Sequence, residues 1–271
     1  MKFTELKNYL IAIDLDGTVI DNGTIIDDES FKVLKELSIN NYVLIATGRP
    51  FRSSIKYYNL LNLNTPIINY NGAYIHNPKD STYKETMITI PRNELIQLID
   101  DNKDLILNAF CEIRDDIFLL ELDDLVKPFL DLDGGNLHIG SFKDILYNNS
   151  NGAILFSKTE HFDKIKAYID NNFKDLLVRP WDFDGVFVIE VYNKMISKAK
   201  AIEDIRKYYN IDKKHTIAFG DGNNDLEMLL EVNYGVAMGN SSKLLLNNSK
   251  YKTKTIKEHG VKAFFESFDF K

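Results

Sequence analysis

The sequence predicts an α/β protein whose parallel sheet is interrupted by an inserted α+β domain. Apolar runs typical of buried strands alternate with amphipathic helical patterns up to about residue 80, and the same alternation returns after residue 195. Between these regions the pattern changes to many strands with few helices. The length of 271 residues suits two domains, since single domains typically have about 100–200 residues. We therefore expect a core domain formed by 1–79 and 191–271 and an inserted domain at 80–190.

The first α/β region begins with a buried strand. The run LIAIDL at 10–15 is apolar and leads into an Asp-Gly pair, which is typical of a strand that enters a turn. The segment 27–41 carries apolar residues at helical spacing behind an acidic first turn, so it predicts a helix that Asn40 or Asn41 closes in the left-handed conformation. The further predicted elements are a strand at 42–47, a helix at 50–61 and a strand at 66–70 that turns at Asn71-Gly72 into a hairpin.

The inserted region mixes strand and helix patterns, and the core pattern returns behind it. Strands predicted in the insertion lie at 82–90, 105–113, 116–122, 152–157, 175–180 and 184–192, with helices near 92–103 and 159–172. After the insertion, helices are predicted at 197–209, 223–232, 242–247 and 259–268, and strands at 215–220, 234–238 and 251–255. This order indicates one α/β domain that is split by a second domain.

Composition and charge limit the kinds of binding partner and the cellular compartment that we expect for this protein. A formal net charge of −7 argues against nucleic acid or an anionic membrane surface as the main partner, because no basic field would attract these polyanions. Cys111 is the only cysteine and lies between apolar residues, which favours a buried side chain over a catalytic thiol and fits a reducing compartment. The N-terminus does not have the pattern of a signal peptide, and no apolar run approaches the roughly 18–20 residues of a membrane span. We therefore expect a cytoplasmic protein.

The pattern Asp-x-Asp-Gly occurs three times. The copies at 131–134 and 182–185 follow prolines and lie among other turn-forming residues, so both are predicted to be turns. The copy at 14–17 follows an apolar strand and precedes Thr18. It places two carboxylates at the carboxyl end of a parallel strand, where ligands bind in open α/β sheets. Taken alone, this copy would also be interpreted as a turn.

Other polar segments also lie at strand ends. Thr47 ends the strand at 42–47, the run GDGNND at 220–225 closes another strand, and Lys198 begins a helix after a third. Each has an ordinary explanation as a helix cap, a loop or a solvated lysine. Together they bring acids, a hydroxyl and a cation to one edge of the sheet, which favours a reaction centre. An EF-hand calcium loop is excluded for both acidic segments, because the glycine required at loop position 6 is missing.

The motifs DLDGT, ATGR, SK and GDGNND, in this order, resemble the signature of haloacid dehalogenase (HAD) superfamily phosphatases. The segments NYNGAYI, GVAMGN and EHGV are similar to further signatures of the Cof-type branch of sugar-phosphatase-like hydrolases. The resemblance covers nearly the whole chain and implies a Rossmann-like core with a C2B-type α+β cap. Two residues depart from the family pattern, since Ala199 stands where Gly is common and Ser241 where Ala is usual. Neither change removes a reacting group.

The resemblance implies the roles of two catalytic aspartates. Asp14 matches the nucleophile that forms an aspartyl-phosphate, and Asp16 matches the general acid that protonates the leaving oxygen and then activates water. The implied cofactor is Mg²⁺, bound by the Asp14 carboxylate, the Asp16 backbone carbonyl and Asp221. Asp225 is expected to support the metal ligands from behind.

The resemblance also assigns residues to the phosphoryl group. Thr47, the Gly48 amide, Lys198 and Asn224 are expected to hold the phosphoryl oxygens. Gly17 is expected to allow the tight turn that brings backbone N–H groups toward the phosphate. The cap is expected to close over this edge of the sheet and to contact the leaving group, with hinges at its boundaries.

The implied substrate is a small phosphorylated metabolite, such as a sugar phosphate, and the expected state is a monomer or a weak homodimer. Signalling receiver domains also use a phosphorylated Asp, but they are much shorter and lack DxDGT. P-type ATPases need membrane spans, which the sequence does not predict. A phosphosugar mutase or phosphotransferase on the same core stays open as an alternative. A metabolite-binding protein without activity is also an alternative, but it would have no use for a second acid at Asp16.

Overall fold

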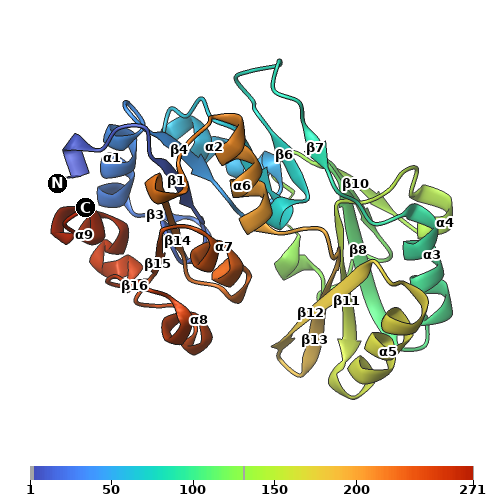
Figure 1. Cartoon of the computed structure of the whole chain (residues 1–271). Helices are drawn as coiled ribbons and strands as arrows, with labels where there is room; N and C mark the ends of the chain where they lie inside the picture. Colours follow the sequence, from blue (N-terminus) through green and yellow to red (C-terminus); the bar gives the residue numbers. More distant parts are fainter. Residues whose placement is uncertain (1–2, 131, 271) are drawn as a thin grey trace. The chain divides into compact units, whose positions relative to one another are not determined.

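Residues 3–130 and 132–270 are described by a computed structural model, which Figure 1 shows. The chain divides into two units, which we name the core unit and the inserted unit. The core unit comprises the described residues up to Arg49, Ser54–Thr86 and those from Ser197 onward, and the inserted unit comprises Pro50–Ser53 and Met87–Ile196. The core unit extends beyond residue 80 because the chain first forms β7 (Thr86–Met87), which lies beside β6 (Tyr74–His76).

A parallel sheet forms the centre of the core unit (Figure 1). Its strands, in spatial order, are β16 (Tyr251–Lys252), β15 (Tyr234–Ala237), β14 (Thr216–Gly220), β1 (Leu10–Ile13) and β4 (Tyr42–Ile45). Leu10 pairs with Thr216 on one side and with Tyr42 on the other. All residues of β1 are buried, as expected for a strand that helices cover on both faces. The predicted α/β core with a parallel sheet is confirmed.

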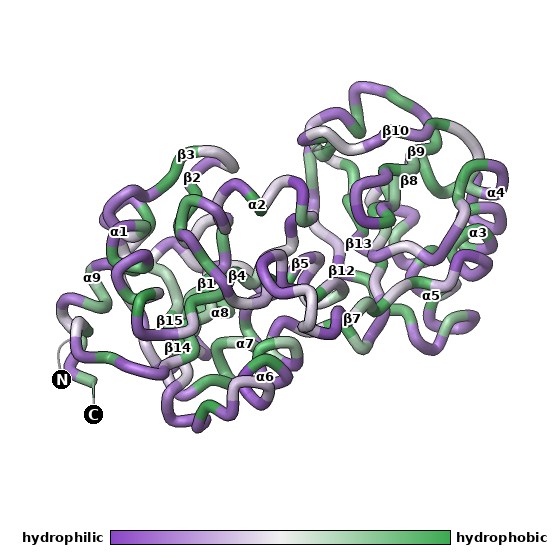
Figure 2. Tube along the Cα trace, turned by 90° about the horizontal axis from the view of Figure 1, so that it is seen from above, coloured by the Kyte–Doolittle hydropathy of each residue, from purple (hydrophilic) through white to green (hydrophobic). Residues whose placement is uncertain are grey.

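Helices cover both faces of this sheet. On one face lie α1 (Asp28–Leu37), α2 (Phe51–Leu60) and α9 (Gly260–Ser267), and on the other lie α6 (Lys198–Tyr208), α7 (Leu226–Glu231) and α8 (Lys243–Asn248). Ala12 of β1 packs in one apolar cluster with Ile202 and Ile205 of α6, whereas Phe219 of β14 contacts Phe264 of α9. In Figure 2 these helices alternate between hydrophobic and hydrophilic residues, as expected for helices with one buried face.

The strand order reverses between β1 and β14. From β1 the chain passes through α1 to β4, away from β14, and from β14 it passes through α7 to β15 in the opposite direction. The carboxyl ends of β1 and β14 are therefore the two sides of the crevice at which ligands bind in doubly wound sheets. The sequence continues from these ends as DLDG at 14–17 and as DGNND at 221–225.

Short hairpins and 3₁₀ turns complete the core unit. β2 (Ile20–Asp21) pairs with β3 (Ile25–Ile26), and β5 (Ile67–Asn69) pairs with β6. The turn between β5 and β6 contains Asn71-Gly72, so the hairpin predicted there is confirmed. The sequence does not predict β2 and β3, because two-residue strands leave no periodic pattern. Turns of 3₁₀ helix lie at Phe3–Glu5, Tyr70–Gly72, Lys213–His215, Asn223–Asp225 and Ile256–Glu258.

The end of α1 differs from the sequence-based expectation. The helix ends at Leu37 with Ser38 in the right-handed conformation, and neither Asn40 nor Asn41 has a positive φ. The prediction of a left-handed Asn at this end is therefore wrong. Asn41 is buried instead, where its side chain accepts from the Tyr9 N–H and donates to the Leu37 carbonyl. These tertiary hydrogen bonds satisfy the helix end in place of a left-handed cap.

The inserted unit is built on a mixed sheet with helices on one face. In spatial order its strands are β10 (Asn136–Ile139), β9 (Asp116–Leu119), β8 (Ile106–Ile113), β11 (Gly152–Lys158), β13 (Val186–Asn193) and β12 (Leu176–Phe183). Neighbouring strands are antiparallel except β10 and β9, which are parallel. The helices are α3 (Arg92–Asp101), α4 (Phe142–Ile145) and α5 (Phe162–Asn172), with 3₁₀ turns at Lys127–Phe129 and Thr159–His161. The predicted α+β architecture is confirmed.

The two later copies of the Asp-x-Asp-Gly pattern form turns. Asp184 and Gly185 both have positive φ and connect β12 to β13. Asp133 and Gly134 also have positive φ and form a turn before β10. Asp131, which begins that copy, lies outside the described residues. The prediction of turns is therefore confirmed wherever the structure describes these copies.

Two predictions from composition can be compared with the structure. Cys111 is buried in the apolar core of the inserted unit, as predicted. Among the helices of residues 3–130 and 132–270, none is both long and apolar enough to cross a membrane.

Candidate active site

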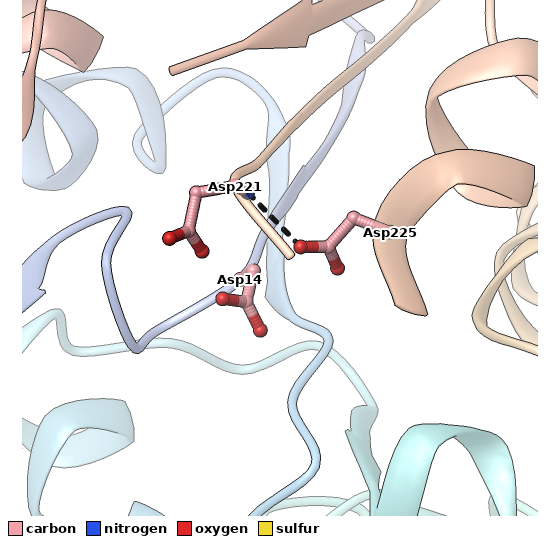
Figure 3. Close-up of side chains that lie close together, drawn as sticks. All are labelled: Asp14, Asp221 and Asp225. Atoms are coloured by element: carbon pink, nitrogen blue, oxygen red, sulfur yellow. Dashed lines mark hydrogen bonds between the residues drawn. The ribbon is translucent and has the colours of Figure 1, made fainter. Parts of the chain in front are cut away.

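Three aspartates meet at the crevice between β1 and β14 in the core unit (Figure 3). Asp14 follows the last residue of β1, and Asp221 follows the last residue of β14. Asp225 lies at the start of α7. One carboxylate oxygen of each residue lies within 4.8 Å of those of the other two. The topology of the sheet therefore brings together acids that the sequence places far apart.

Lys198 balances part of this negative charge. Lys198 is the first residue of α6, and only 2% of its surface is exposed. Ala199 is the second residue of this helix. Nζ of Lys198 donates to Oδ1 of Asp14 at 2.6 Å and to Oδ1 of Asp225 at 2.7 Å. Burial by itself would lower the pKa of Lys198, but the charges of Asp14 and Asp225 outweigh it and raise the pKa above its ordinary value. Lys198 is therefore a permanent cation between two carboxylates.

The three carboxyl groups carry more negative charge than Lys198 can balance. Burial raises the pKa of Asp14 well above its usual range, although the charge of Lys198 acts in the opposite direction. Burial, followed by the charge of Asp225, raises the pKa of Asp221 to about 7. Three carboxylates beside one ammonium group leave an excess of negative charge that is unfavourable away from water. The cluster therefore favours the binding of a proton or a cation.

Both carboxylate oxygens of Asp225 accept hydrogen bonds from the protein. Oδ1 accepts from Lys198, and Oδ2 accepts from the backbone N–H groups of Asp221 and Gly222 at 3.0 Å each. Figure 3 shows the bond to Asp221. Gly220 permits this arrangement, because a Cβ there would lie 2.5 Å from the Asp225 side chain. Asp225 therefore orients Asp221 and Lys198, which suits a supporting position behind the site.

The oxygen donors of the cluster fit a divalent cation. Asp14 and Asp221 present carboxylate oxygens, which are the hard ligands that Mg²⁺ prefers, and the excess negative charge favours its binding. Gly17 forms the adjacent wall of the site. Its φ is +71°, and a Cβ there would lie 2.0 Å from Oδ2 of Asp221. Any other residue at this position would take the space of that carboxylate, so both the turn and the Asp221 position require glycine.

Asp16 is paired with Arg49. Its half-exposed carboxylate accepts from Nε of Arg49 at 2.7 Å and from a terminal nitrogen at 2.5 Å. The same nitrogen donates to the Gly23 carbonyl at 2.6 Å. The sequence pattern alone does not indicate Arg49 as a site residue, although this residue ends the motif ATGR. Its pairing with a residue far away in the chain depends on the neighbouring positions of β1 and β4, which the motif alone does not contain.

The residues expected to bind phosphoryl oxygens lie on neighbouring loops. Thr47 is buried just after β4, where its Oγ1 accepts from the Arg49 N–H at 3.1 Å. Asn224 lies between β14 and α7, and its Nδ2 donates to Oδ1 of Asn71 at 3.0 Å. A Cβ at Gly48 would lie 3.3 Å from the same Oδ1. Asn71 is not among the site residues predicted from the sequence, although the segment NYNGAYI contains it.

Asn240 is a further residue at this crevice that is not among the predicted site residues. Its Nδ2 donates to the Gly17 carbonyl at 2.7 Å and to Oδ2 of Asp221 at 3.3 Å. It therefore connects the two loops that carry the carboxylates. The motif GVAMGN contains this residue, but its spacing does not reveal the partners. The hydroxyl of Ser241, where the family commonly has Ala, donates to the Gly220 carbonyl at 3.4 Å.

The core unit contains a doubly wound parallel sheet, and an α+β domain is inserted into its chain. A buried Asp–Lys–Asp cluster lies where the strand order of this sheet reverses. Together these features define an HAD-type hydrolase. The chain belongs to the haloacid dehalogenase-like hydrolase family, whose model matches residues 11–265. The motifs DLDGT and GDGNND lie within this match, and so do all the residues of the cluster.

Individual relatives agree with this assignment over nearly their whole length. The chain is 31% identical to the 5-amino-6-(5-phospho-D-ribitylamino)uracil phosphatase YitU of Bacillus subtilis, covering 97% of this chain and 98% of that protein. The crystal structure of TM0651 from Thermotoga maritima is similar in fold, with a TM-score of 0.81, 24% identity and coverage of 97% and 98%. A sugar phosphatase of HAD subclass IIB matches with a TM-score of 0.74, 23% identity and coverage of 94% and 96%. The predicted assignment to the Cof-type HAD phosphatases is confirmed.

Proposed function

We propose that this protein is a Mg²⁺-dependent phosphatase that hydrolyses small phosphorylated metabolites, such as sugar phosphates or similar phosphomonoesters, through an aspartyl-phosphate intermediate. One observation carries the proposal. Asp14 is buried at the carboxyl end of β1, hydrogen-bonded to the ammonium group of Lys198 and close to the carboxylate of Asp221. A carboxylate in these surroundings can attack phosphorus while cations neutralise the phosphoryl oxygens.

The first step of the proposed reaction transfers the phosphoryl group to Asp14. An oxygen of Asp14 forms a bond to phosphorus as the bond from phosphorus to the leaving oxygen breaks. Lys198 donates to Asp14 and Asp225, and the third hydrogen of its ammonium group can go to a phosphoryl oxygen. Bound Mg²⁺ would supply the remaining positive charge, held by the Asp14 and Asp221 carboxylates and the Asp16 carbonyl, with Asp225 behind them.

Asp16 moves the proton in both steps. It gives a proton to the leaving alkoxide oxygen, and it then takes a proton from the water that attacks the phosphorus of the Asp14 acyl phosphate, as the bond from phosphorus to the Asp14 oxygen breaks. This second attack releases inorganic phosphate and regenerates Asp14. In the structure both oxygens of Asp16 accept from Arg49. Asp16 must therefore release Arg49 before it can act on the substrate. Phosphate oxygens of the substrate can take over the Arg49 guanidinium group, because they bind such a group well.

We assign the remaining contacts of the phosphoryl oxygens to Thr47, the Gly48 N–H, Lys198 and Asn224. The register of the sheet supports this assignment. The N–H of Ala46 donates to the Ile13 carbonyl at 2.8 Å, so the loop after β4 begins beside the residue that precedes the nucleophile. Donors grouped around one nucleophile are what a phosphoryl group requires.

A screen of phosphate release tests the proposal. Purified protein with Mg²⁺ is offered a panel of phosphorylated metabolites and an aryl phosphate, and Asp14→Asn serves as the control. We expect turnover by the wild type on at least one compound and none by the variant. If the wild type releases no more phosphate than the variant on every compound, the protein is not a phosphatase of this kind. An isomeric phosphate ester as the product, in place of free phosphate, would favour the mutase alternative.

Among phosphomonoesters, we propose a phosphorylated sugar alcohol attached to a pyrimidine as the first substrate to test. The support comes from YitU, whose name states that it acts on 5-amino-6-(5-phospho-D-ribitylamino)uracil and which is similar over 97% of this chain. We expect this ester to have a higher kcat/KM than glucose 6-phosphate or ribose 5-phosphate. Equal or lower kcat/KM for the ribitylaminouracil phosphate would contradict this substrate class but leave the phosphatase proposal intact.

A further inference from the structure

We propose that Asn71 is a positioning residue for the phosphatase reaction: it fixes the amide of Asn224 and bounds the space beside Gly48, so that both can meet the phosphoryl oxygens. The inference rests on the function proposed above. It concerns a residue of the segment NYNGAYI for which the sequence predicts a hairpin turn and no role in the reaction. Two contacts connect Asn71 to the segments that carry the proposed phosphate ligands, and the backbone conformation of its turn indicates that the surroundings impose this placement.

The first contact fixes the orientation of the Asn224 amide. Oδ1 of Asn71 accepts from Nδ2 of Asn224 at 3.0 Å. At the other end of the same amide, Oδ1 of Asn224 lies 2.4 Å from where a Cβ at Gly222 would be, so it packs against the backbone of that glycine. The amide is thus held between Asn71 and Gly222. An amide nitrogen carries two hydrogens, and the bond to Asn71 uses one of them. The bond to Asn71 therefore also sets the direction in which the second hydrogen of Asn224 points.

The second contact concerns the loop after β4. The backbone N–H of Asn71 donates to the Thr47 carbonyl at 3.0 Å. Its side chain lies beside Gly48, where a Cβ would be 3.3 Å from Oδ1 and 3.4 Å from Nδ2 of Asn71. Both residues that we assign to the phosphoryl oxygens on this loop therefore touch Asn71. One side chain with its own backbone contacts proposed phosphate ligands from two loops far apart in the sequence.

The third observation is the backbone conformation of the turn. Tyr70, Asn71 and Gly72 have φ of +49°, +56° and +108°, so three successive residues occupy the left-handed region. The first two are not glycine, and tyrosine is strongly disfavoured there. Such a conformation persists only where the surrounding contacts impose it, and it is concentrated at functional sites. A simple hairpin would be formed more favourably by other turn residues.

Gly72 connects this turn to the third segment of the site. A Cβ at Gly72 would lie 2.7 Å from the carbonyl oxygen of Ser197 and 3.0 Å from its carbonyl carbon. Ser197 is the N-cap of α6 and directly precedes Lys198. The turn therefore packs against the segments that carry Thr47, Lys198 and Asn224. A turn in this place sets the separation of those residues, which is the quantity that phosphoryl transfer depends on.

Asn71→Gly tests the inference, because glycine adopts the left-handed conformation readily while it removes the amide. Asn62→Gly is the matched control, since Asn62 also has a positive φ, +52°, but lies in the turn after α2. We expect Asn71→Gly to lower kcat/KM by about 10- to 100-fold, the effect typical of groups that orient ligands from behind. Asn62→Gly should stay within about twofold of the wild type, because it removes an amide in the same backbone conformation away from the site. Both variants should keep the Tm of the wild type within a few degrees.

Binding of inorganic phosphate in the presence of Mg²⁺ gives a second readout, measured by calorimetry, that does not need turnover. Asn71→Gly should weaken this binding several-fold, and Asn62→Gly should leave it unchanged. A merely structural role for Asn71 would alter Tm without a selective loss of phosphate binding. If Asn71→Gly binds phosphate and turns over substrate like the wild type, the inference is wrong.

A double-mutant comparison tests whether Asn71 acts through Asn224. We expect Asn71→Gly to cause less than about a threefold further loss in a protein that already carries Asn224→Ala, because the amide that it orients is absent. Losses that multiply fully would overturn this part of the inference. If the wild type binds phosphate but hydrolyses nothing, the proposed function fails while the binding data still decide the role of Asn71. If the wild type neither binds phosphate nor hydrolyses an ester, both proposals are wrong.

Discussion

Asp14, Lys198 and Asp225 show how burial and pairing set the charges of the candidate site. Each of these side chains is almost fully buried, and a charge in such surroundings costs several kcal/mol unless it is paired. Lys198 pairs with both aspartates. Among the described residues, Asp221 makes no ion pair with a basic side chain, and burial raises its pKa to about 7 although the charge of Lys198 acts in the opposite direction. The negative charge that Lys198 leaves uncompensated favours the binding of a cation at this cluster.

Asp16→Asn is expected to act selectively on esters with poor leaving groups. A sugar alkoxide needs a proton as it leaves, whereas an aryl oxide with a low pKa does not. We therefore expect a loss of kcat of about 10²- to 10⁴-fold on sugar phosphates and a clearly smaller loss on p-nitrophenyl phosphate. Steady-state kinetics on both substrates measure this difference, with Asp14→Asn as the variant that loses both activities. Equal losses of Asp16→Asn on both esters would show that Asp16 is not the general acid.

Asp221→Asn is expected to stabilise the metal-free protein by an amount that grows with pH. The pKa of Asp221 in the fold is about 7 because of burial and then Asp225, whereas in the unfolded chain it is the ordinary value near 4. The folded state holds this proton more tightly, so the stability from Asp221 is fully present below about pH 4 and is lost as the pH rises through 7. In EDTA, the variant and the wild type should melt together near pH 4.5, and the variant should melt several degrees higher at pH 8. A difference in Tm that does not change with pH would contradict the raised pKa.

At the scale of elements, the loop between β1 and α1 contains two glycines with the same backbone conformation and different surroundings. Gly17 has φ +71° and Gly23 has φ +76°. A Cβ at Gly17 would lie 2.0 Å from Oδ2 of Asp221, whereas a Cβ at Gly23 would meet no atom within 4 Å. This pair separates the effect of left-handed backbone strain from the effect of a collision within the site.

We therefore expect Gly17→Ala and Gly23→Ala to lose similar amounts of stability but very different amounts of activity. Each substitution puts a Cβ on a left-handed residue, which costs about 1–2 kcal/mol of stability. Gly17→Ala should in addition displace Asp221 and lower kcat/KM by about 100-fold, as small displacements in an active site commonly do. Gly23→Ala should keep kcat/KM within a few-fold of the wild type. Chemical denaturation and steady-state kinetics of both variants provide the comparison, and similar activities would contradict the close approach of Gly17 to Asp221.

Hydrogen bonds of Asp27 connect the N-terminal end of α1 to the N-terminal end of α9. We expect these bonds to contribute to the stability of the fold and not to catalysis. The side chain of Asp27 is 2% exposed and accepts from the Ser30 hydroxyl at 2.5 Å and from Nδ1 of His259 at 2.7 Å. Asp27→Ala removes the helix cap and leaves these donors without their acceptor, so it should cost about 1–3 kcal/mol. Asp28→Ala changes an exposed neighbour and should cost less than about 0.5 kcal/mol. Urea denaturation measures the loss of stability in both variants, and equal losses would contradict a stabilising role of the Asp27 hydrogen bonds.

At the scale of the whole molecule, the site is assembled from two segments that the inserted unit separates in the chain. Asp14 and Asp16 come from the segment before Met87, and Lys198 and Asp221 come from the segment that begins at Ser197. The unfolded chain does not hold these residues together. A ligand that binds them therefore stabilises the folded state by mass action, in proportion to the logarithm of its concentration over its Kd.

Mg²⁺ is expected to raise the Tm of the wild type by about 5–10 °C at a concentration 100 times its Kd. Binding at that concentration contributes about 2.7 kcal/mol. Each kcal/mol shifts Tm by about 2–4 °C in a protein of this size. Asp221→Asn removes a ligand, so its Tm should change little with Mg²⁺, and EDTA should reverse the shift in the wild type. Scanning calorimetry measures the shift, and an equal rise for both proteins would place the metal elsewhere.

The pattern of the sequence predicts the core sheet, its helices and the α+β insertion, because alternating apolar periods and strand-end motifs are local properties. It misses β2 and β3, which are too short to leave a period, and the edge strand β10, whose residues are exposed or half-buried and so lack an apolar pattern. It also misplaces the end of α1, where Asn41 bonds to a residue from another part of the chain. The partners of Arg49, Asn71 and Asn240 are missed for the same reason. Each is a contact between loops that only the folded sheet brings together.

The sequence by itself determined the family and the α/β core, and it indicated the candidate reacting groups, because each motif stands at the end of a strand and the ends of parallel strands meet at one edge. The tertiary structure decided how those groups are paired and buried. It paired Asp16 with Arg49, placed Lys198 between two aspartates and buried Asp221 enough to raise its pKa to about 7. Charge states and hydrogen-bond partners depend on distance and burial, and neither quantity exists until the segments before and after the insertion have folded together.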